Sequence, residues 1–301
     1  MKGLISQKRD EFHRVLIEQR TLAFSKFNRY GETRIASNAD SGQRVSVRLS
    51  NLLFDKLAHR LDIRPDISEK KKDGQTTGNE FEAACAKFLN DTFPKLDVLR
   101  PGKWSVTQIH QRSEAVLGQF EQYSHLSELN ALAQEHKTLR NFLGDGYTVA
   151  PDVIISRAPE LDEDINQFID IVDSISSKNT MIREVNHKGN SHSLLHASIS
   201  CKFTMRSDRA QNTRTEALNL LRTRKGRAPH IVSVTAEPMA SRIASLALGT
   251  GDMDYVYHFA LYELIECCQE LNLEESLDLL TTMIEGKRLR DISDLPLDLS
   301  V

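Results

Sequence analysis

The sequence is poor in the residues that cross-link small secreted proteins and in the apolar runs that span membranes. Its 301 residues include four cysteines, and none of them forms a Cys-x-x-Cys pair. This spacing argues against a zinc ribbon or a disulfide framework and favours a reducing cytoplasm. No apolar run approaches the roughly 18 residues of a membrane helix. The segment Met1–Asp10 mixes charges and lacks an apolar signal core, so we do not expect secretion.

The composition is nevertheless that of a folded protein. Hydrophobic residues make up 40% and charged residues 27%, which permits a buried core and argues against extensive disorder. The chain contains no internal repeat, no low-complexity tract and no clear linker. We therefore expect a single domain over residues 1–301.

Charge is distributed unevenly along the chain. The net charge of −3 argues against a general nucleic-acid binder. However, Lys202–Pro229 holds eight Lys or Arg and two acids, a balance of +6, whereas His230–Val301 holds four and thirteen, a balance of −9. Such a local basic segment indicates a surface for a polyanion, usually a phosphate backbone. A solvated helix face is the alternative.

Hydrophobic spacing predicts helices that alternate with strands. We expect helices at 4–23, 49–61, 79–93, 113–143 with an interruption near Ser124, 212–225, 241–248 and, as a pair, within 257–286. Strands are expected at 147–156, 196–205 and 230–236, with paired strands around a turn within 96–108. Segments 31–47 and 67–78 are expected to be loops, and 159–192 a long polar excursion. This order predicts an α/β fold with a mixed sheet.

Two charged residues stand in otherwise apolar strands. Asp152 lies within the apolar segment 147–156, where a carboxylate needs a partner or a metal. In the next strand, the alternation of side chains places Ser198, Ser200 and Lys202 on one face. A lysine there can stabilise charge at a scissile phosphate. The structural alternatives are a capping aspartate and an edge-strand lysine.

Two glutamates allow both a catalytic and a structural interpretation. Glu216 follows Thr213 at the spacing of a capping box, and Glu82 follows Asn79 at the same spacing. Catalysis and capping are not exclusive at a helix end. Glu82 heads a wholly apolar stripe along its helix, whereas the stripe from Glu80 turns polar, so Glu82 is the one expected to face inward. Three inward carboxylates suit Mg²⁺, and a metal-bound water with a nearby lysine is the scheme of two-metal phosphodiester hydrolysis.

The segment Arg206-Ser-Asp-Arg209 follows the lysine strand directly. Arginine can bind the O6 and N7 atoms of guanine, and aspartate can accept from N4 of cytosine. Asp208 would repel phosphates, so this cluster favours base reading over backbone binding, with a local salt-bridged turn as the alternative. The histidines at 187, 192 and 196 fit no face of a helix or strand and do not predict a zinc site.

These residues carry a pattern that resembles the NgoMIV-type restriction endonucleases. The strongest stretch is 196–251, which includes SCKFTMRSDR at 200–209 and Glu216. The resemblance extends to GQTTGNEFEA at 74–83, APDVII at 150–155, VYHFALYEL at 256–264 and GKRLRDISDLPLDL at 286–299. It implies a PD-(D/E)xK core, with a mixed central β-sheet flanked by helices. The active-site motif is a variant, because Ser200 takes the usual acidic position and Glu216 supplies the acid.

The resemblance also implies roles for individual residues. Asp152 would bridge two Mg²⁺ ions, with Glu82 and the backbone carbonyl of Cys201 as further ligands, and Lys202 would sit at the scissile phosphate beside Glu216. The inner CCGG would be read by Arg206, Asp208 and Arg209, and the outer pairs by Arg242 and Gln75. Ser41 stands where a minor-groove loop is expected, although its neighbours are reordered.

The implied activity is Mg²⁺-dependent cleavage of double-stranded DNA at GCCGGC after the first G, by a cytoplasmic homotetramer built from two dimers. The implied division of the chain is an N-terminal segment of helices and loops at 1–78, a catalytic and DNA-reading core at 79–251 and C-terminal helices at 252–301. Two other functions would use similar residues. One is a non-catalytic sequence-specific DNA-binding protein, and the other is a structure-selective repair nuclease.

Overall fold

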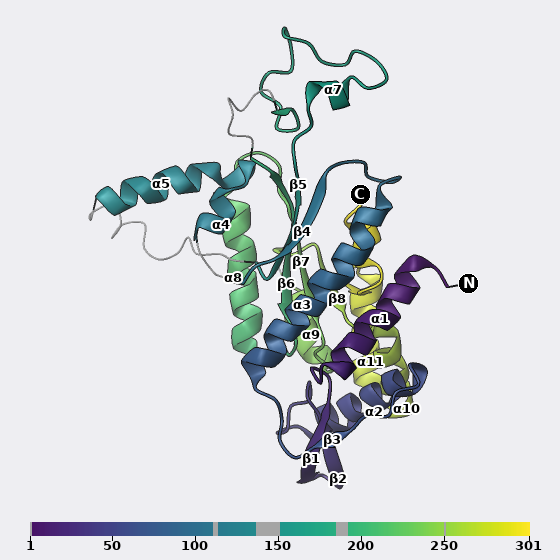
Figure 1. Cartoon of the computed structure of the whole chain (residues 1–301). Helices are drawn as coiled ribbons and strands as arrows, with labels where there is room; N and C mark the ends of the chain where they lie inside the picture. Colours follow the sequence, from purple (N-terminus) through teal and green to yellow (C-terminus); the bar gives the residue numbers. More distant parts are fainter. Residues whose placement is uncertain (1, 111–113, 137–150, 185–191, 250) are drawn as a thin grey trace.

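The computed structural model describes residues 2–110, 114–136, 151–184, 192–249 and 251–301. A six-stranded sheet runs through these regions of the chain (Figure 1), with the strand order β4-β5-β6-β7-β8-β9. The bounds of these strands are β4 Trp104–Gln108, β5 Val153–Arg157, β6 Leu194–Lys202, β7 His230–Thr235, β8 Tyr255–His258 and β9 Leu289–Asp291.

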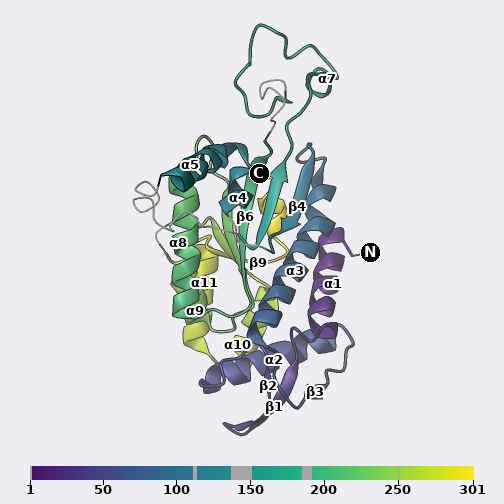
Figure 2. The same ribbon diagram turned by 60° about the vertical axis from the view of Figure 1, so that its left-hand side comes forward.

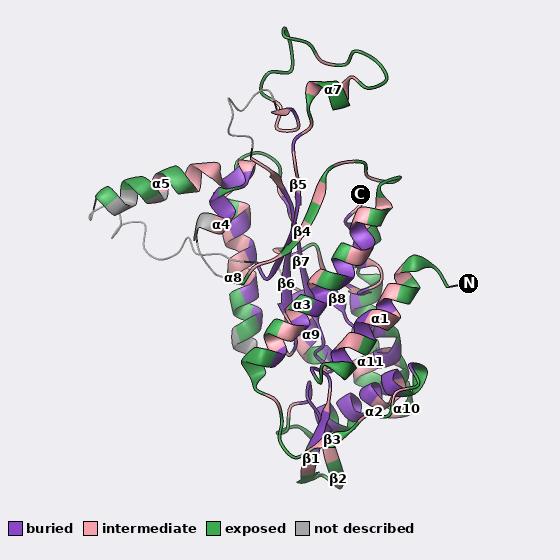
Figure 3. Cartoon of the chain, in the orientation of Figure 1, coloured by how far each residue is buried: buried purple, intermediate pink, exposed green. Residues whose placement is uncertain are grey.

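The sheet is mixed, as the sequence predicts. Strands β4, β5 and β6 pair antiparallel, whereas β6, β7, β8 and β9 pair parallel. Helical crossovers connect the parallel strands, because a parallel pair cannot be joined by a tight turn. Figure 3 shows that β5, β6 and β7 are buried along most of their length. Their near-continuous apolar runs follow from this burial on both faces.

Helices cover both faces of the sheet (Figure 2). On one side, α3 packs against β4 and β6, and α1 packs on α3. On the other side lie α8, α9 and α11, with α9 against β8. The bounds of the longer helices are α1 Leu4–Glu18, α2 Arg44–Arg60, α3 Gly74–Thr92, α5 Ser124–Glu135, α8 Ser207–Thr223, α9 Ala240–Ala247, α10 Leu261–Glu270 and α11 Glu274–Glu285. The shorter ones are α4 Glu114–Gly118, α7 Asp162–Ile165, α12 Leu295–Asp298, η1 Phe93–Leu96 and η2 Glu121–Tyr123.

A second, three-stranded sheet contradicts the loop predicted for 31–47. Strands β1 (Phe24–Arg29) and β2 (Glu32–Ala36) form a hairpin, and β3 (Ile67–Ser68) pairs with β1. The hairpin turn consists of Tyr30 and Gly31, which both have positive φ. A two-residue turn of this kind matches the right-handed twist of paired strands. The Ser/Asn/Gly-rich composition of the segment concealed this turn.

Two further predictions about the strands were wrong. Segment 96–108 holds one strand, β4, and its partner is β5 rather than the residues before the Arg-Pro-Gly turn. The segment 257–286 does hold two helices, but β8 and β9 flank them and were missed because they are short. The interruption predicted near Ser124 within the helical segment 113–143 is confirmed, because η2 ends at Tyr123 and α5 begins at Ser124, although the part before it holds only the short helices α4 and η2. Residues 137–150, including the start of the strand predicted at 147, lie outside the described residues.

Both capping boxes proposed from the sequence are absent from the structure. Helix α3 begins at Gly74, where the Asp73 carboxylate accepts from the N–H groups of Gln75 and Thr76 at 2.9 and 3.1 Å. Helix α8 begins at Ser207, so Thr213 lies inside it and donates to the carbonyl of Arg209 at 3.0 Å. Capping therefore explains neither Glu82 nor Glu216.

The polar excursion is confirmed as an arm that extends away from the sheet (Figures 1 and 2). Its described residues, 158–184, contain α7 and an ion pair between Arg183 and Asp162 at 2.5 Å. Apolar side chains on this arm are open to solvent, with Phe168 90% and Ile175 80% exposed.

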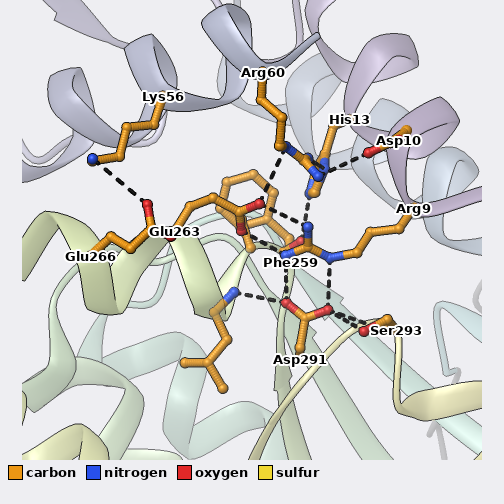
Figure 4. Close-up of polar contacts among 12 residues, drawn as sticks. Arg9, Asp10, His13, Lys56, Arg60, Phe259, Glu263, Glu266, Asp291 and Ser293 are labelled. Atoms are coloured by element: carbon orange, nitrogen blue, oxygen red, sulfur yellow. Dashed lines mark hydrogen bonds and ion pairs between the residues drawn. The ribbon is translucent and has the colours of Figure 1, made fainter. Parts of the chain in front are cut away.

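A buried ion network fastens the N-terminal helix to the end of the main sheet (Figure 4). The guanidinium of Arg9 donates two hydrogen bonds to Glu263, at 2.8 and 2.6 Å, and two to Asp291, both at 2.8 Å. Sequence reasoning did not find this network, because Arg9 is more than 250 residues away from both carboxylates. Among the described residues, no helix combines the length and the apolar character required to cross a membrane.

Candidate functional site

A cavity of about 700 Å³ opens where β5 begins and β6 ends. Most of the residues proposed from the sequence line it: Gln75, Glu82, Asp152, Cys201, Lys202, Arg206, Arg209 and Glu216. They come from α3, the start of β5, β6 and the first half of α8. The convergence predicted from residues far apart in the sequence is therefore present as a shared cavity.

Asp152 and Lys202 form the charged centre of this cavity. The Lys202 ammonium donates to Oδ2 of Asp152 at 2.8 Å, and the backbone N–H of Cys201 donates to the same oxygen at 2.7 Å. Both side chains are largely buried. Burial by itself would lower the pKa of Lys202, but the Asp152 carboxylate and, more weakly, Glu216 raise it above its ordinary value. The lysine therefore remains a cation at neutral pH.

The strand β6 presents two faces, as its alternating sequence predicts. Ser200 lies on the face of Lys202, with its hydroxyl 3.5 Å from Oδ2 of Asp152. On the opposite face the thiol of Cys201 contacts Cys85, and this hydrogen bond together with burial raises the pKa of Cys201 well above its ordinary value. The thiol stays protonated and cannot bind a metal as a thiolate. Cys201 can therefore offer a metal only its backbone carbonyl oxygen.

The ladder between β5 and β6 ends just before Cys201, at the pairing of Val153 with Ile199. Pro151, two residues before Val153, has no backbone N–H with which to extend this ladder. Instead of pairing with a β5 carbonyl, the N–H of Cys201 donates to the Asp152 carboxylate.

Helix α3 brings Glu82 to the cavity. The neighbouring Phe81 is fully buried and contacts Phe203, with 5.5 Å between the ring centroids. This contact fixes the rotation of the helix against the end of β6. Glu80 faces elsewhere: it accepts from the hydroxyl of Thr21 at 2.8 Å and pairs with Lys72. The apolar stripe of the helix therefore selected the correct glutamate to face inward.

Two arginines extend into the cavity from the start of α8. Arg206 and Arg209 are both exposed to solvent, and Arg209 is oriented by hydrogen bonds to the carbonyl and hydroxyl oxygens of Thr204, at 3.2 and 2.9 Å. The backbone of Asp208 lies in the first turn of the same helix, but its side chain is outside the described regions of the chain.

Arg242 and Ser41 are not among the residues that line the cavity. Arg242, in the first turn of α9, pairs with Asp40, the residue before Ser41. Hydrogen bonding from Arg242 lowers the pKa of Asp40, so this carboxyl is ionised at neutral pH. Arg242 also lies 3.7 Å from the carboxylate of Glu237.

Sequence reasoning missed Asp40 and Glu237. The signal for Glu237 was present in the strands: Lys202 pairs with Thr235 in a parallel ladder, so both strands end at one edge of the sheet. An acid two residues beyond that strand has to lie beside the residues that follow Lys202. Asp40 had no such signal, because the hairpin that positions it was interpreted as a loop.

The donor groups at the cavity fit a hard divalent cation. Asp152 and Glu82 offer carboxylate oxygens and Cys201 offers a carbonyl oxygen, which are the ligand types that Mg²⁺ takes in proteins. Within the described residues, no three His, Cys, Asp or Glu side chains are grouped as a complete metal site. A site made from two carboxylates, a carbonyl, water and phosphate does not require such a group.

The arrangement defines a class of protein: an enzyme with a mixed sheet whose edge presents a lysine–carboxylate centre and a basic segment to a polyanion. Comparisons with known proteins give the family. The family model for the NgoMIV restriction enzyme matches residues 12–301. The type II restriction enzyme NgoMIV of Neisseria gonorrhoeae is 46% identical over 301 residues, with both chains fully covered.

The chain therefore belongs to the NgoMIV restriction enzyme family, and it is a type II restriction endonuclease. Its partner is accordingly double-stranded DNA. A crystal structure of the type IIF restriction endonuclease Bse634I with cognate DNA is also similar. It has a TM-score of 0.41 and 10% identity, and covers 84% of this chain and 97% of the other, which is too distant to inform the site.

Proposed function

We propose that this enzyme hydrolyses DNA at GCCGGC after the first G, with Mg²⁺, to leave four-nucleotide 5′ overhangs that carry 5′-phosphates. One observation carries the proposal: a single cavity collects the catalytic candidates Asp152, Glu82, Lys202 and Glu216 together with the arginines at the start of α8. A protein that only bound DNA would have no use for the catalytic candidates. A structure-selective nuclease would have no use for the arginines at the start of α8.

Asp152, Glu82 and the carbonyl of Cys201 are the proposed ligands of two Mg²⁺ ions. The end of the β5–β6 ladder at Val153 and Ile199 supports this assignment, because Pro151, just before the ladder, has no N–H to donate to β6. Bound metal would activate a water molecule and neutralise charge at the phosphate.

Lys202 is proposed to bind the scissile phosphate. Its raised pKa keeps the ammonium charged, and a charged donor in a largely buried site stabilises the negative charge that develops on phosphate oxygens. Asp152 holds this ammonium in position at 2.8 Å. Ser200 occupies the usual acidic position of the motif, and Glu216, at the same cavity, is proposed to provide the missing carboxylate.

The remaining residues are proposed to read the sequence. Arg206, Asp208 and Arg209 would read the inner CCGG, as the place of the two arginines at the cavity and the order Arg-x-Asp-Arg suggest. Arg242 and Gln75 would read the outer pairs, and Ser41 would lie at the minor groove. A twofold dimer matches a palindromic site.

The chain is further proposed to act as a homotetramer of two such dimers. The exposed apolar side chains of the arm support assembly, because soluble proteins seldom leave neighbouring large apolar residues uncovered. Light scattering of the full chain should give four times the monomer mass. A Phe168→Ser/Ile175→Ser variant that assembled equally well would remove the arm from this argument.

Digestion of a DNA of known sequence tests the function directly. With Mg²⁺ we expect discrete fragments whose ends map to GCCGGC after the first G. Specific binding in Ca²⁺ without cleavage in Mg²⁺ would indicate a non-catalytic DNA-binding protein. Preference for branched DNA over a CCGG duplex would indicate a repair nuclease, and random nicking would contradict sequence recognition.

A further inference from the structure

Glu237 is a buried carboxylate that the catalytic scheme does not use. It is 1% exposed and lies two residues beyond β7. Its backbone is held by the sheet: its N–H donates to the hydroxyl of Thr235 at 3.1 Å, and its carbonyl accepts from Nε2 of His258 at 3.2 Å. The side chain therefore extends from a fixed point at the edge of the sheet.

The two carboxylate oxygens bind two different segments. Oε2 accepts from the backbone N–H of Met205 at 2.8 Å, and Oε1 accepts from that of Met239 at 3.2 Å. Met205 directly precedes Arg206, and Met239 directly precedes α9, which carries Arg242. Arg242 itself approaches Oε2 at 3.7 Å. A single side chain thus contacts the supports of both proposed reading groups.

The distance between these groups matters for recognition. Successive base pairs are about 3.4 Å apart, so a guanidinium displaced by a fraction of that distance loses its bidentate contact. Recognition sites have to be held to within about 0.5 Å by surrounding hydrogen bonds. Met205 is fully buried, so its N–H would lack a partner without the carboxylate.

We infer that Glu237 is a positioning residue for sequence recognition, which sets the spacing between the inner reading group at Arg206–Arg209 and the outer reading residue Arg242. This inference rests on the proposed function. The inference goes beyond the proposed function, because the positions of both reading groups would depend on one shared side chain.

The test is a comparison of binding in Ca²⁺ to three duplexes: GCCGGC, ACCGGT with the outer pairs changed, and GCATGC with the central pairs changed. We expect Glu237→Gln to reduce the preference for GCCGGC over both altered duplexes by about tenfold, which corresponds to about 1.4 kcal/mol for each. Affinity for unrelated DNA should change little. The melting temperature should fall, because the amide of Gln can accept from only one of the two backbone N–H groups, and thermal unfolding checks that the variant is folded at the assay temperature. Glu285→Gln, at an exposed glutamate on α11, is the matched control.

Two further variants separate this inference from the proposed function. Arg206→Ala should reduce only the inner preference, and Arg242→Ala only the outer. If neither does so, the reading groups are misassigned, whatever Glu237 does. If both do so and Glu237→Gln alters one preference alone, or none, the shared positioning role is wrong.

A double-mutant cycle of Glu237 and Arg242 also tests whether Glu237 acts on the outer pairs through Arg242. In the Arg242→Ala background, Glu237→Gln should no longer affect the outer preference but should still reduce the inner one. If Glu237→Gln fails to fold, Glu237→Asp retains the charge and shortens the reach. It should then weaken both preferences together, and a loss confined to one of them would overturn the inference.

Discussion

The catalytic cavity and the Arg9 network are both built from buried charges, and they differ in what surrounds those charges. In the network, one guanidinium meets two carboxylates in four hydrogen bonds, and Asp291 also accepts from the N–H of Leu261 at 2.9 Å (Figure 4). At the cavity, the Asp152–Lys202 pair borders about 700 Å³ of open space. A buried charge enclosed by its partners stabilises the fold, whereas one that faces a cavity can also act on a ligand.

Loss of Arg9 should produce the largest effect of all, and only on stability. Arg9→Ala removes the guanidinium that both buried carboxylates accept from and leaves Glu263 with Arg60 alone, at 3.4 Å, which should lower the free energy of unfolding by about 3–5 kcal/mol. Urea unfolding measures this loss. Lys2→Ala, which removes an exposed ion pair with Asp10, is the control and should cost at most about 1 kcal/mol. Equal losses in the two variants would show that the network is not what fastens α1.

Loss of Lys202 should reduce cleavage rather than stability. Lys202→Ala should reduce the single-turnover cleavage rate by roughly 10²- to 10³-fold, because the phosphate loses its charged donor. Binding to GCCGGC in Ca²⁺ and the unfolding transition should be largely retained. Lys95→Ala, at an exposed lysine in η1, should cleave normally. Cleavage that persisted without Lys202 would remove this lysine from the mechanism.

Glu80 and Glu82, two residues apart on α3, allow the same comparison within one helix. Glu82→Gln weakens a proposed metal ligand, and cleavage at limiting Mg²⁺ should decrease on the order of 10- to 100-fold. Glu80→Gln disrupts contacts with Thr21 and Lys72 instead, so it should lower stability without changing cleavage by the folded enzyme. Mg²⁺ titrations of the two variants measure this difference. The reverse outcome would mean that the helix faces the cavity differently.

The free energy of unfolding should depend on pH through His13, which lies beside the Arg9 network. Burial, aided by the charge of Arg9, lowers the pKa of His13 to about 4, and its ring accepts from Arg60 and donates to the carbonyl of Phe259. The folded state keeps this ring neutral, whereas the unfolded chain takes up the proton below its ordinary pKa of 6.5. Stability is therefore present above pH 6.5 and is lost as the pH falls towards 4.

The expected loss from His13 alone is about 2 kcal/mol at pH 5. Urea unfolding at pH 7 and pH 5 measures it. His13→Gln should reduce the dependence on pH, whereas His59→Gln, at an exposed histidine, should leave it unchanged. An identical pH dependence in both variants would place the acid sensitivity elsewhere.

Some features of the site could be predicted because they depend on local periodicity. Alternation along β6 placed Ser200 and Lys202 on one face, and the apolar stripe of α3 separated Glu82 from Glu80. The capping boxes were wrong although their residue spacing was correct. Asp73 and the packing of Phe81 on Phe203 decide where α3 begins and how it is rotated, and these contacts do not follow from a four-residue pattern.

The sequence by itself determined the mixed α/β architecture, the family and the residue types that carry the chemistry, because periodicity and a long matching pattern are properties of the chain order. Only the tertiary structure decided that the N–H of Cys201 donates to Asp152, that Glu237 contacts both reading segments, and that Arg9 meets Glu263 and Asp291. Each of these is a pairing across separate elements. Strand register and helix packing set such pairings through the burial of the whole core.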